Sequence, residues 1–327
     1  MAVEVGVELC FPHLNTSCLK PGSLWFSLLL TSTLSPTSFF TVSLNLLVII
    51  SISHFRQLYT PTNILLLSLA ITDLLIGLVS MPVELIQRTS CWYFGDVVCL
   101  LAIFSPLFLT SVSIGNILLI SIDRYVAICD PLRYSSRVTH RRASVCVCLC
   151  WLCSVLYICL YLKDTLSQPG RFSTCDGECT FQIDLAMGTV DVVLSFIIPF
   201  AAIIVLYIRV FIVAASQARA MRSHVTAVNL QLSLAIPVKK SELKAARTLG
   251  ILVMIFLICF LPSFYFSIAG EDLGYTPFGA FVIFVFYLNS CVNPLIYAMF
   301  YPWFRKAVRL IVTLQILQPG SREANVL

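Results

Sequence analysis

Charged residues are scarce in this sequence. They make up 11% of its 327 residues, whereas hydrophobic residues make up 59%. Soluble domains contain about 25% charged residues, so this composition excludes a soluble fold. The formal net charge of +5 gives no reason to expect a nucleic-acid partner. The four histidines, at positions 13, 54, 140 and 224, lie outside the long apolar runs, which argues against a metal cluster inside a membrane.

Seven long runs contain few or no charged residues. Each is long enough for a helix that crosses a bilayer, which needs about 20 residues. The runs are Leu24–Ser53, Asn63–Val83, Val97–Ile122, Ala143–Leu162, Leu185–Ile208, Thr248–Ala269 and Leu273–Trp303. The sequence therefore predicts an all-α membrane protein, a bundle of seven transmembrane helices with its two ends on opposite sides of the membrane.

Basic residues decide the orientation of this bundle. With the N-terminus outside, all of the 21 Lys and Arg residues except Lys20, Arg88, Lys163 and Arg171 fall on the inner side. Positive residues accumulate at the cytoplasmic ends of membrane helices, so we expect an extracellular N-terminus. We expect the basic inner segments to lie near anionic membrane lipid.

The chain divides into three parts by composition. Residues 1–23 form a polar extracellular arm, which has neither a basic start nor an apolar run and is not expected to be a cleavable signal peptide. Residues 24–303 form the bundle. Residues 304–327 form a cytoplasmic tail, and a short amphipathic eighth helix, Trp303–Leu314, is expected on the inner membrane face. Asn15 begins a glycosylation sequon in the outer arm.

The 14 cysteines fall into two sets. Six lie on the outer side, where disulfides persist, and six cysteines can pair in many ways. They are Cys10, Cys18, Cys91, Cys99, Cys175 and Cys179. The other eight lie in or below the membrane and are expected to act as small apolar fillers.

Two acids, Asp73 and Asp191, lie well inside the apolar runs. A charged residue at the bilayer centre costs about 2.5–3.5 kcal/mol on insertion scales, and no Lys or Arg lies inside a run to pair with it. A protonated amine would supply the missing charge to Asp191 in a cleft of low dielectric constant. The alternative is that Asp191 has a structural role, with its carboxyl group capped by hydroxyls such as that of Ser195.

Each run carries a characteristic residue or motif, and these occur in a fixed order. They are Asn45, the LAITD run that ends at Asp73, Asp123-Arg124-Tyr125, Trp151, Pro199, Pro262 and Asn293-Pro294-Leu295-Ile296-Tyr297. This ordered set resembles the rhodopsin-like G protein-coupled receptors over essentially the whole chain. The stretch from Asn289 to Phe304, NSCVNPLIYAMFYPWF, together with the loop CWYFGD at residues 91–96, is similar to the trace amine-associated receptors.

The resemblance implies a plasma-membrane receptor for small-molecule amines, of the trace amine or olfactory type, in olfactory sensory neurons. It implies activation of a stimulatory heterotrimeric G protein, Gs or its olfactory form, and a rise in cyclic AMP. It implies no enzymatic activity and no cofactor other than an allosteric sodium ion. It also implies the disulfides Cys99–Cys179 and Cys18–Cys175, and it leaves both Cys10 and Cys91 unassigned.

The chain departs from most aminergic receptors on the third helix. Those receptors place the amine-binding Asp seven residues after the disulfide cysteine, where this chain has Pro106. In this respect it resembles a fish-expanded branch of the trace amine receptors, in which the acid stands on the fifth helix at the position of Asp191. Candidate pocket walls are Leu107, Thr110, Ser111, Phe264, Ser267, Ile283 and Tyr287, with plain helix packing as the alternative for each.

Glu84, on the outer turns of the second helix, allows two interpretations. It is either a second cation site, which would admit a diamine ligand, or a side chain that extends to water.

Two further sets of residues match the superfamily nearer the inner face. Asp73, Ser113, Asn289, Ser290 and Asn293 resemble its sodium pocket, whose hard oxygen ligands suit such an ion; a network of waters is the alternative. The activation residues are an Arg124–Glu242 ion-pair lock, a core switch of Pro199, Ile114 and Phe256, and the inner tyrosines Tyr207 and Tyr297. Phe260 stands where the superfamily usually has Trp. For Arg124, the alternative to an activation lock is an ion pair with a purely structural role.

Other functional classes fit less well. An opsin needs a lysine on the seventh helix, and residues 273–303 contain none. A transporter is the non-receptor alternative, although an odd number of helices and the lack of an internal repeat argue against it. Within the superfamily, the alternative is a receptor for a non-amine ligand in which Asp191 has a structural role.

Overall fold

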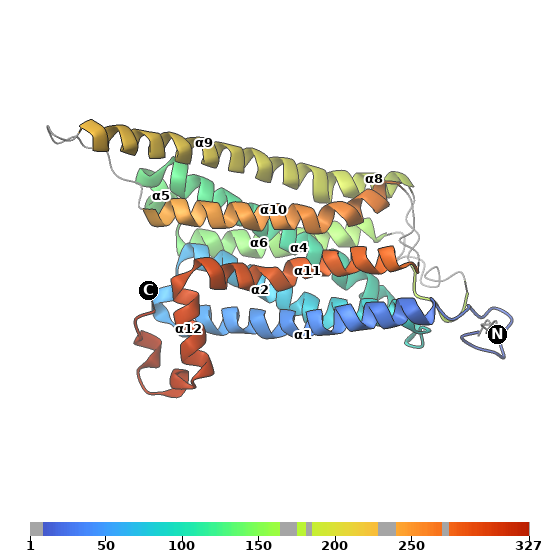
Figure 1. Cartoon of the computed structure of the whole chain (residues 1–327). Helices are drawn as coiled ribbons and strands as arrows, with labels where there is room; N and C mark the ends of the chain where they lie inside the picture. Colours follow the sequence, from blue (N-terminus) through green and yellow to red (C-terminus); the bar gives the residue numbers. More distant parts are fainter. Residues whose placement is uncertain (1–8, 164–174, 181–184, 228–239, 270–274, 327) are drawn as a thin grey trace.

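The computed structural model describes residues 9–163, 175–180, 185–227, 240–269 and 275–326. Within the helices, the side chains of residues 185, 214–215, 217–227, 240–249, 252 and 267–269 lie outside this description. The predicted bundle is confirmed: seven long helical segments run side by side along one axis (Figure 1).

The segments follow one another in chain order. The first is α1, Leu24–His54, and the second joins α2, Pro61–Leu75, through a π-helical turn, η2, Ile76–Ser80, to α3, Met81–Thr89. The third is α4, Gly95–Cys129, and the fourth is α6, His140–Tyr161. The fifth joins α8, Leu185–Asp191, through a second π-helical turn, η3, Val192–Ile197, to α9, Ile198–Ala227. The sixth is α10, Lys240–Ala269, and the seventh is α11, Pro277–Phe300.

Several helices begin at a capping residue that the sequence supplies. Ser23, Thr60 and Thr276 each accept a hydrogen bond from a backbone N–H of the first turn, at 3.0–3.2 Å. Pro61 and Pro277 follow two of these caps directly. Proline suits the first helical turn because the N–H that it lacks has no partner there. Local sequence therefore fixes where α1, α2 and α11 start.

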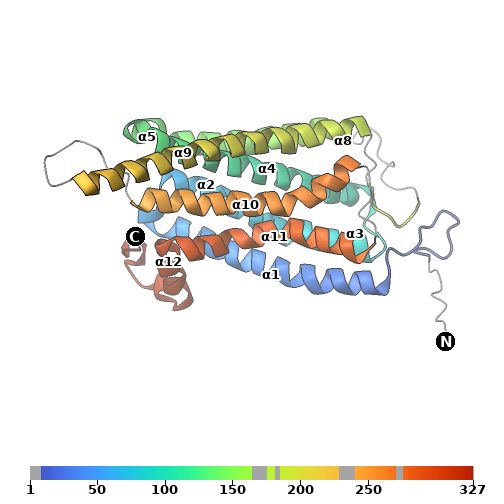
Figure 2. The ribbon, with the colours of Figure 1, turned by 45° about the horizontal axis from the view of Figure 1, so that its top comes forward.

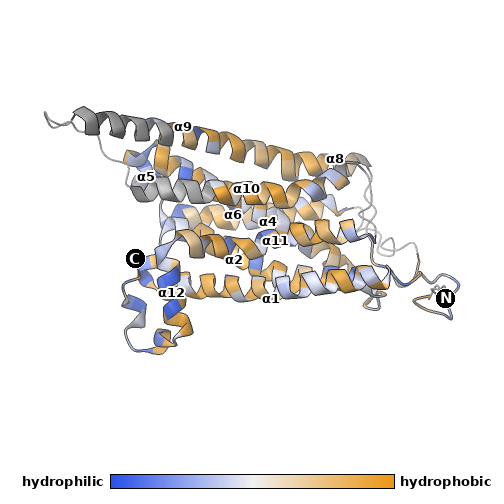
Figure 3. Ribbon diagram, viewed as in Figure 1, coloured by the Kyte–Doolittle hydropathy of each residue, from blue (hydrophilic) through white to orange (hydrophobic). Residues whose placement is uncertain are grey.

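Hydrophobic residues predominate along most of the helices of the bundle (Figure 3). On α6, Leu149, Leu152, Leu156 and Leu160 are 54–66% exposed, an arrangement that suits lipid rather than water. Among the described residues, 6 helices are long and apolar enough to cross a membrane, and the sixth segment adds a shorter apolar stretch, Val253–Phe266.

The inner end of the bundle carries short helices. α5, Pro131–Arg137, follows α4, and α12, Pro302–Val312, follows α11. α12 lies at the end of the bundle opposite to α3 and α8 (Figure 2). It buries Trp303, Phe304 and Ala307 and exposes basic side chains, and it is the predicted amphipathic eighth helix.

Three disulfides close the outer end. Two of them, Cys99–Cys179 and Cys18–Cys175, are those that the family resemblance implies. The third joins the two cysteines that were left unassigned, Cys10 and Cys91. The arm is thus bonded both to the turn that precedes α4 and to the loop that follows α6.

Backbone hydrogen bonds join the same segments. Cys18 N–H donates to Asp176 O and Asp176 N–H to Thr16 O, each at 2.8 Å, and Trp92 N–H donates to Gly177 O at 2.9 Å. Gly177 has a φ of +102°, and a Cβ at this position would lie 2.6 Å from the Cβ of Cys10. Only glycine fits both the backbone angle and this close approach. Asn15 is exposed in the same arm, and its glycosylation stays a prediction.

Candidate ligand-binding site

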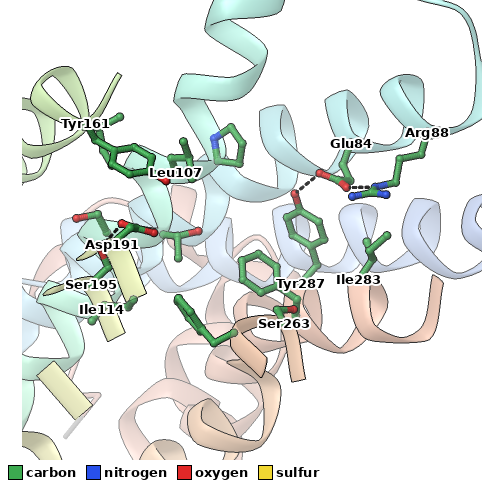
Figure 4. A pocket seen from close by; sticks show the side chains of 16 residues that line it. Glu84, Arg88, Leu107, Ile114, Tyr161, Asp191, Ser195, Ser263, Ile283 and Tyr287 are labelled. Atoms are coloured by element: carbon green, nitrogen blue, oxygen red, sulfur yellow. Dashed lines mark hydrogen bonds and ion pairs between the residues drawn. The ribbon is translucent and has the colours of Figure 1, made fainter. Parts of the chain in front are cut away.

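A pocket of about 360 Å³ opens in the outer half of the bundle, and six of the seven helical segments contribute to its wall (Figure 4). The structure brings most of the predicted ligand-binding residues to it: Glu84, Leu107, Thr110, Ser111, Asp191, Ser195, Phe264, Ile283 and Tyr287. The side chain of Ser267 lies outside the described part. The wall also contains Arg88, Pro106, Ile114, Ile158, Tyr161, Ser263 and Phe286.

Asp191 is held by two hydroxyl groups. Tyr157 OH donates to Asp191 Oδ1 at 2.6 Å, and Ser195 Oγ donates to the same oxygen at 2.7 Å. Ser195 Oγ also lies 3.0 Å from Tyr157 OH. Within the described part of the chain, Asp191 Oδ2 accepts no hydrogen bond and no basic side chain forms an ion pair with Asp191. The carboxylate is therefore fixed at one oxygen while the other retains its capacity to accept.

The local shape of the fifth segment places these groups. Asp191 ends α8, and the π-helical turn η3 begins at the next residue. A π-helical turn is wider than an α-helical one and is frequent at functional sites. Tyr157, across from it on α6, was not predicted, because a tyrosine in an apolar run gives no sign of whether it faces lipid or the pocket.

Pro106 lies in the pocket wall on α4. It offers no charge and no donor where most aminergic receptors have a carboxylate. Five residues further along α4, Ser111 Oγ donates to Ser154 Oγ at 3.1 Å, so this hydroxyl also links α4 to α6.

Glu84 and Arg88 lie on the opposite side of the pocket from Asp191 (Figure 4). They form an ion pair across one turn of α3, with side chains 18% and 26% exposed respectively. Tyr287 OH on α11 donates to the other Glu84 oxygen at 3.4 Å. Arg88 was not predicted as a wall residue, although its position four residues after Glu84 is the spacing of a helical ion pair.

The inner wall of the pocket continues into an aromatic column. Phe264 stacks on Phe196 with a centroid distance of 4.1 Å, and Phe260 lies 4.3 Å from Phe256. Phe256 in turn stacks on Phe200 at 5.2 Å. Among the predicted switch residues, Phe256, Phe260 and Ile114 are buried in the same apolar cluster, while Pro199 is half-buried.

The five residues of the predicted sodium pocket are all buried, at 0–3% exposure. Asn293 Nδ2 donates to Asp73 Oδ2 at 2.7 Å. Asp73 Oδ1 and Ser113 Oγ are buried with no hydrogen-bond partner in the described part of the chain. Such groups are costly unless something binds them, so this donor set fits a small cation.

Arg124 forms its ion pair near the inner end with its neighbour Asp123 and also donates to Thr62. Tyr134 OH donates to Asp123 Oδ1 at 2.9 Å, and burial together with the Asp123 carboxylate raises the pKa of this tyrosine. The side chain of Glu242, the predicted partner of Arg124, lies outside the described part. The predicted lock therefore stays a prediction.

The inner tyrosines Tyr207 and Tyr297 both have buried hydroxyls that make no hydrogen bond within the described residues. They lie where α9 and α11 approach the inner end, and Tyr297 is 1% exposed.

Comparison with known proteins agrees with this architecture. Residues 44–297 match the model of the 7 transmembrane receptor (rhodopsin family). Trace amine-associated receptor 13c of Danio rerio is 40% identical over 335 residues, which cover 98% of this chain and 96% of that protein. Trace amine-associated receptor 7e of Rattus norvegicus is 39% identical over 335 residues, with 98% and 92% covered.

Both the domain match and the relatives extend over the helices that form the pocket and the buried polar core. They also account for a multi-pass protein of the plasma membrane that is not an enzyme. The chain belongs to the trace amine-associated receptors, within the rhodopsin family of G protein-coupled receptors.

Proposed function

We propose that this receptor binds an amine whose ammonium group pairs with Asp191. The observation that carries the proposal is the state of this carboxylate: two hydroxyls hold Oδ1, and the described wall supplies no cation to Asp191. An ammonium group would complete both the charge and the hydrogen bonds of the site.

The rest of the wall suits the body of such a ligand. Phe264 and Phe286 offer aromatic faces, and Leu107 and Ile283 offer apolar surface. An aromatic face within about 6 Å attracts a cation, so an ammonium group that approaches Phe264 would gain this attraction as well. The names of the relatives, trace amine-associated receptors, support an amine ligand independently of this geometry.

The test is the response of cells that express the receptor with a cyclic AMP reporter. Asp191→Asn keeps the shape of the side chain and removes its charge. We expect a loss of amine potency of ~100-fold or more, because a contact between unit charges at ~4 Å is worth ~4 kcal/mol at an effective dielectric constant of ~20. Asp96→Asn, an exposed acid in the first turn of α4, is the matched control.

A receptor for a non-amine ligand is the second candidate, favoured by the hydroxyls that already cap Oδ1 of Asp191. It predicts that Asp191→Asn reaches the cell surface and responds to the receptor's agonists with unchanged potency. That outcome would reject the ammonium site.

We also propose that the receptor activates a stimulatory G protein, Gs or its olfactory form, and serves in olfactory sensory neurons. Family membership supports this assignment. Cells that lack the stimulatory α subunits should show no cyclic AMP response, and the response should return with either form.

A sodium ion is the third part of the proposal. Asp73 Oδ1 and Ser113 Oγ, together with Asn289, Ser290 and Asn293, would hold it, because hard oxygen ligands suit an alkali cation. When bound, the ion would supply positive charge to a carboxylate that is 0% exposed.

A further inference from the structure

The wall of the pocket opposite Asp191 contains both an acid and a base. Glu84 and Arg88 are paired on successive turns of α3, and Tyr287 OH donates to the same carboxylate. Among the pocket-lining side chains that the structure describes, the charged groups are Asp191, Glu84 and Arg88. One end is therefore anionic, whereas the other is an ion pair.

The partner of Glu84 decides what this end can bind. A second ammonium group on the ligand would be attracted by Glu84 but repelled by Arg88, a few ångströms away. A carboxylate group on the ligand would be attracted by Arg88 but repelled by Glu84. An uncharged group such as a hydroxyl or amide can accept from Arg88 and donate to Glu84 without breaking the ion pair.

We propose that Arg88 is a specificity-determining residue, which makes this end of the pocket select an uncharged polar group and reject a second ammonium group. The inference rests on the proposed ammonium site at Asp191. The preferred ligand is a monoamine that carries a hydroxyl, amide or similar group at its far end, and a diamine of the same length is a poorer ligand.

The dimensions of the site agree with a ligand that reaches both ends. Figure 4 shows Asp191 and Ser195 on one side of the pocket, and Glu84 and Arg88 on the other. Tyr287 lies between the Glu84–Arg88 pair and α10. A volume of about 360 Å³ lies within the range of pockets that take a small organic molecule of moderate size. A short alkylamine at Asp191 would leave the Glu84–Arg88 end to water.

The test compares unbranched amino alcohols with diamines of equal chain length, in the cyclic AMP assay. In the unmodified receptor, the amino alcohol should be ~10-fold or more potent than the diamine at the length that spans the pocket. Arg88→Gln removes the positive charge beside Glu84, so this ratio should shift toward the diamine by ~10-fold or more. Arg88→Lys keeps a positive charge and should keep the original preference.

Glu84→Gln is an independent test, in which the potency ratio of amino alcohol to diamine should shift in the opposite direction. It removes the acid and leaves Arg88, so the diamine should become weaker still. If Arg88→Gln does not reach the cell surface, the Glu84→Gln receptor alone decides. A diamine as potent as the amino alcohol in the unmodified receptor, or a ratio that neither variant moves, would overturn the inference. Failure of the ammonium site can be distinguished from this outcome. In that case Asp191→Asn would leave the potency of every amine unchanged from that in the unmodified receptor.

Discussion

Asp73 and Asp191 are two acids in the same bundle with different surroundings. Asp73 is fully buried, and one of its oxygens has no hydrogen-bond partner among the described residues. Asp191 is half-buried and borders a pocket of molecular size. The proposed sodium ion would bind at the first acid and the proposed ammonium group at the second, so one kind of side chain would serve two kinds of ligand.

The sodium proposal gives a prediction at this scale. In membranes with the unmodified receptor, replacing sodium by a bulky organic cation at constant ionic strength should change amine affinity by ~5-fold or more, if the proposed ion at Asp73 is coupled to the ligand site. Asp73→Asn should abolish this dependence. Ligand binding measured across a sodium titration is the readout, and a dependence that survives in Asp73→Asn would place the ion elsewhere.

Sequence reasoning located some pocket residues better than others. Asp191 and Glu84 were found because an acid in or near an apolar run is conspicuous. Tyr157 was missed because hydropathy does not distinguish the lipid face of α6 from its inner face. Arg88 was assigned only to the outer side, since its interaction with the pocket depends on the exact rotation of α3.

At the scale of elements, two π-helical turns interrupt helical segments that contribute to the pocket wall. η2 and η3 interrupt the second and fifth segments, and no residue type in Ile76–Ser80 or Val192–Ile197 signals them. Such turns arise from tertiary packing rather than from local propensity, which is why the sequence predicted the helices but not these irregular turns.

A close contact between α4 and α6 gives a prediction about helix packing. A Cβ on Gly115 would lie 2.4 Å from Sγ of Cys150, and small residues let membrane helices approach each other in this way. Gly115→Ala should therefore lower stability by about 1–3 kcal/mol and reduce the amount of receptor at the cell surface.

The second substitution Cys150→Ala, which removes the sulfur, should restore much of this loss. Surface labelling and thermal unfolding of the detergent-solubilised receptor would measure both effects. If Gly115→Ala is harmless, or if Cys150→Ala gives no rescue, the contact does not limit the packing of these helices.

For the whole molecule, hydropathy and the distribution of Lys and Arg were sufficient to predict seven helices, and the family motifs gave two of the three disulfides. The Cys10–Cys91 bridge could not be predicted, because the pairing of outer cysteines depends on how the arm folds over the loops. That fold rests on backbone contacts such as Trp92 to Gly177, which no local sequence pattern signals.

The contribution of each disulfide to stability depends on the loop that it closes when the other two disulfides are present. Cys10 and Cys91 are 81 residues apart in the chain, but the other two bridges already connect their segments. The third bridge therefore closes only a short ring formed by residues 10–18, 91–99 and 175–179. We expect the pair of substitutions Cys10→Ser and Cys91→Ser to cost about 3 kcal/mol, the value for a short loop.

Thermal unfolding of the solubilised receptor measures this cost. Replacing Cys18 and Cys175 with serine provides the comparison, since either pair of substitutions opens the same ring. Amine potency should change little in the Cys10–Cys91 variant, because Cys18–Cys175 still holds the arm. An unfolding temperature equal to that of the unmodified receptor would show that the third bridge does not form.

The disulfides at the outer end also affect how candidate ligands can be examined. A ligand that carries a free thiol beside its amino group is both a candidate agonist and a reductant, and it can exchange with the bridges that hold the arm to the outer loops. Its apparent potency would then drift with exposure time, so sulfur-containing amines need brief application and a washout control that oxygen analogues do not.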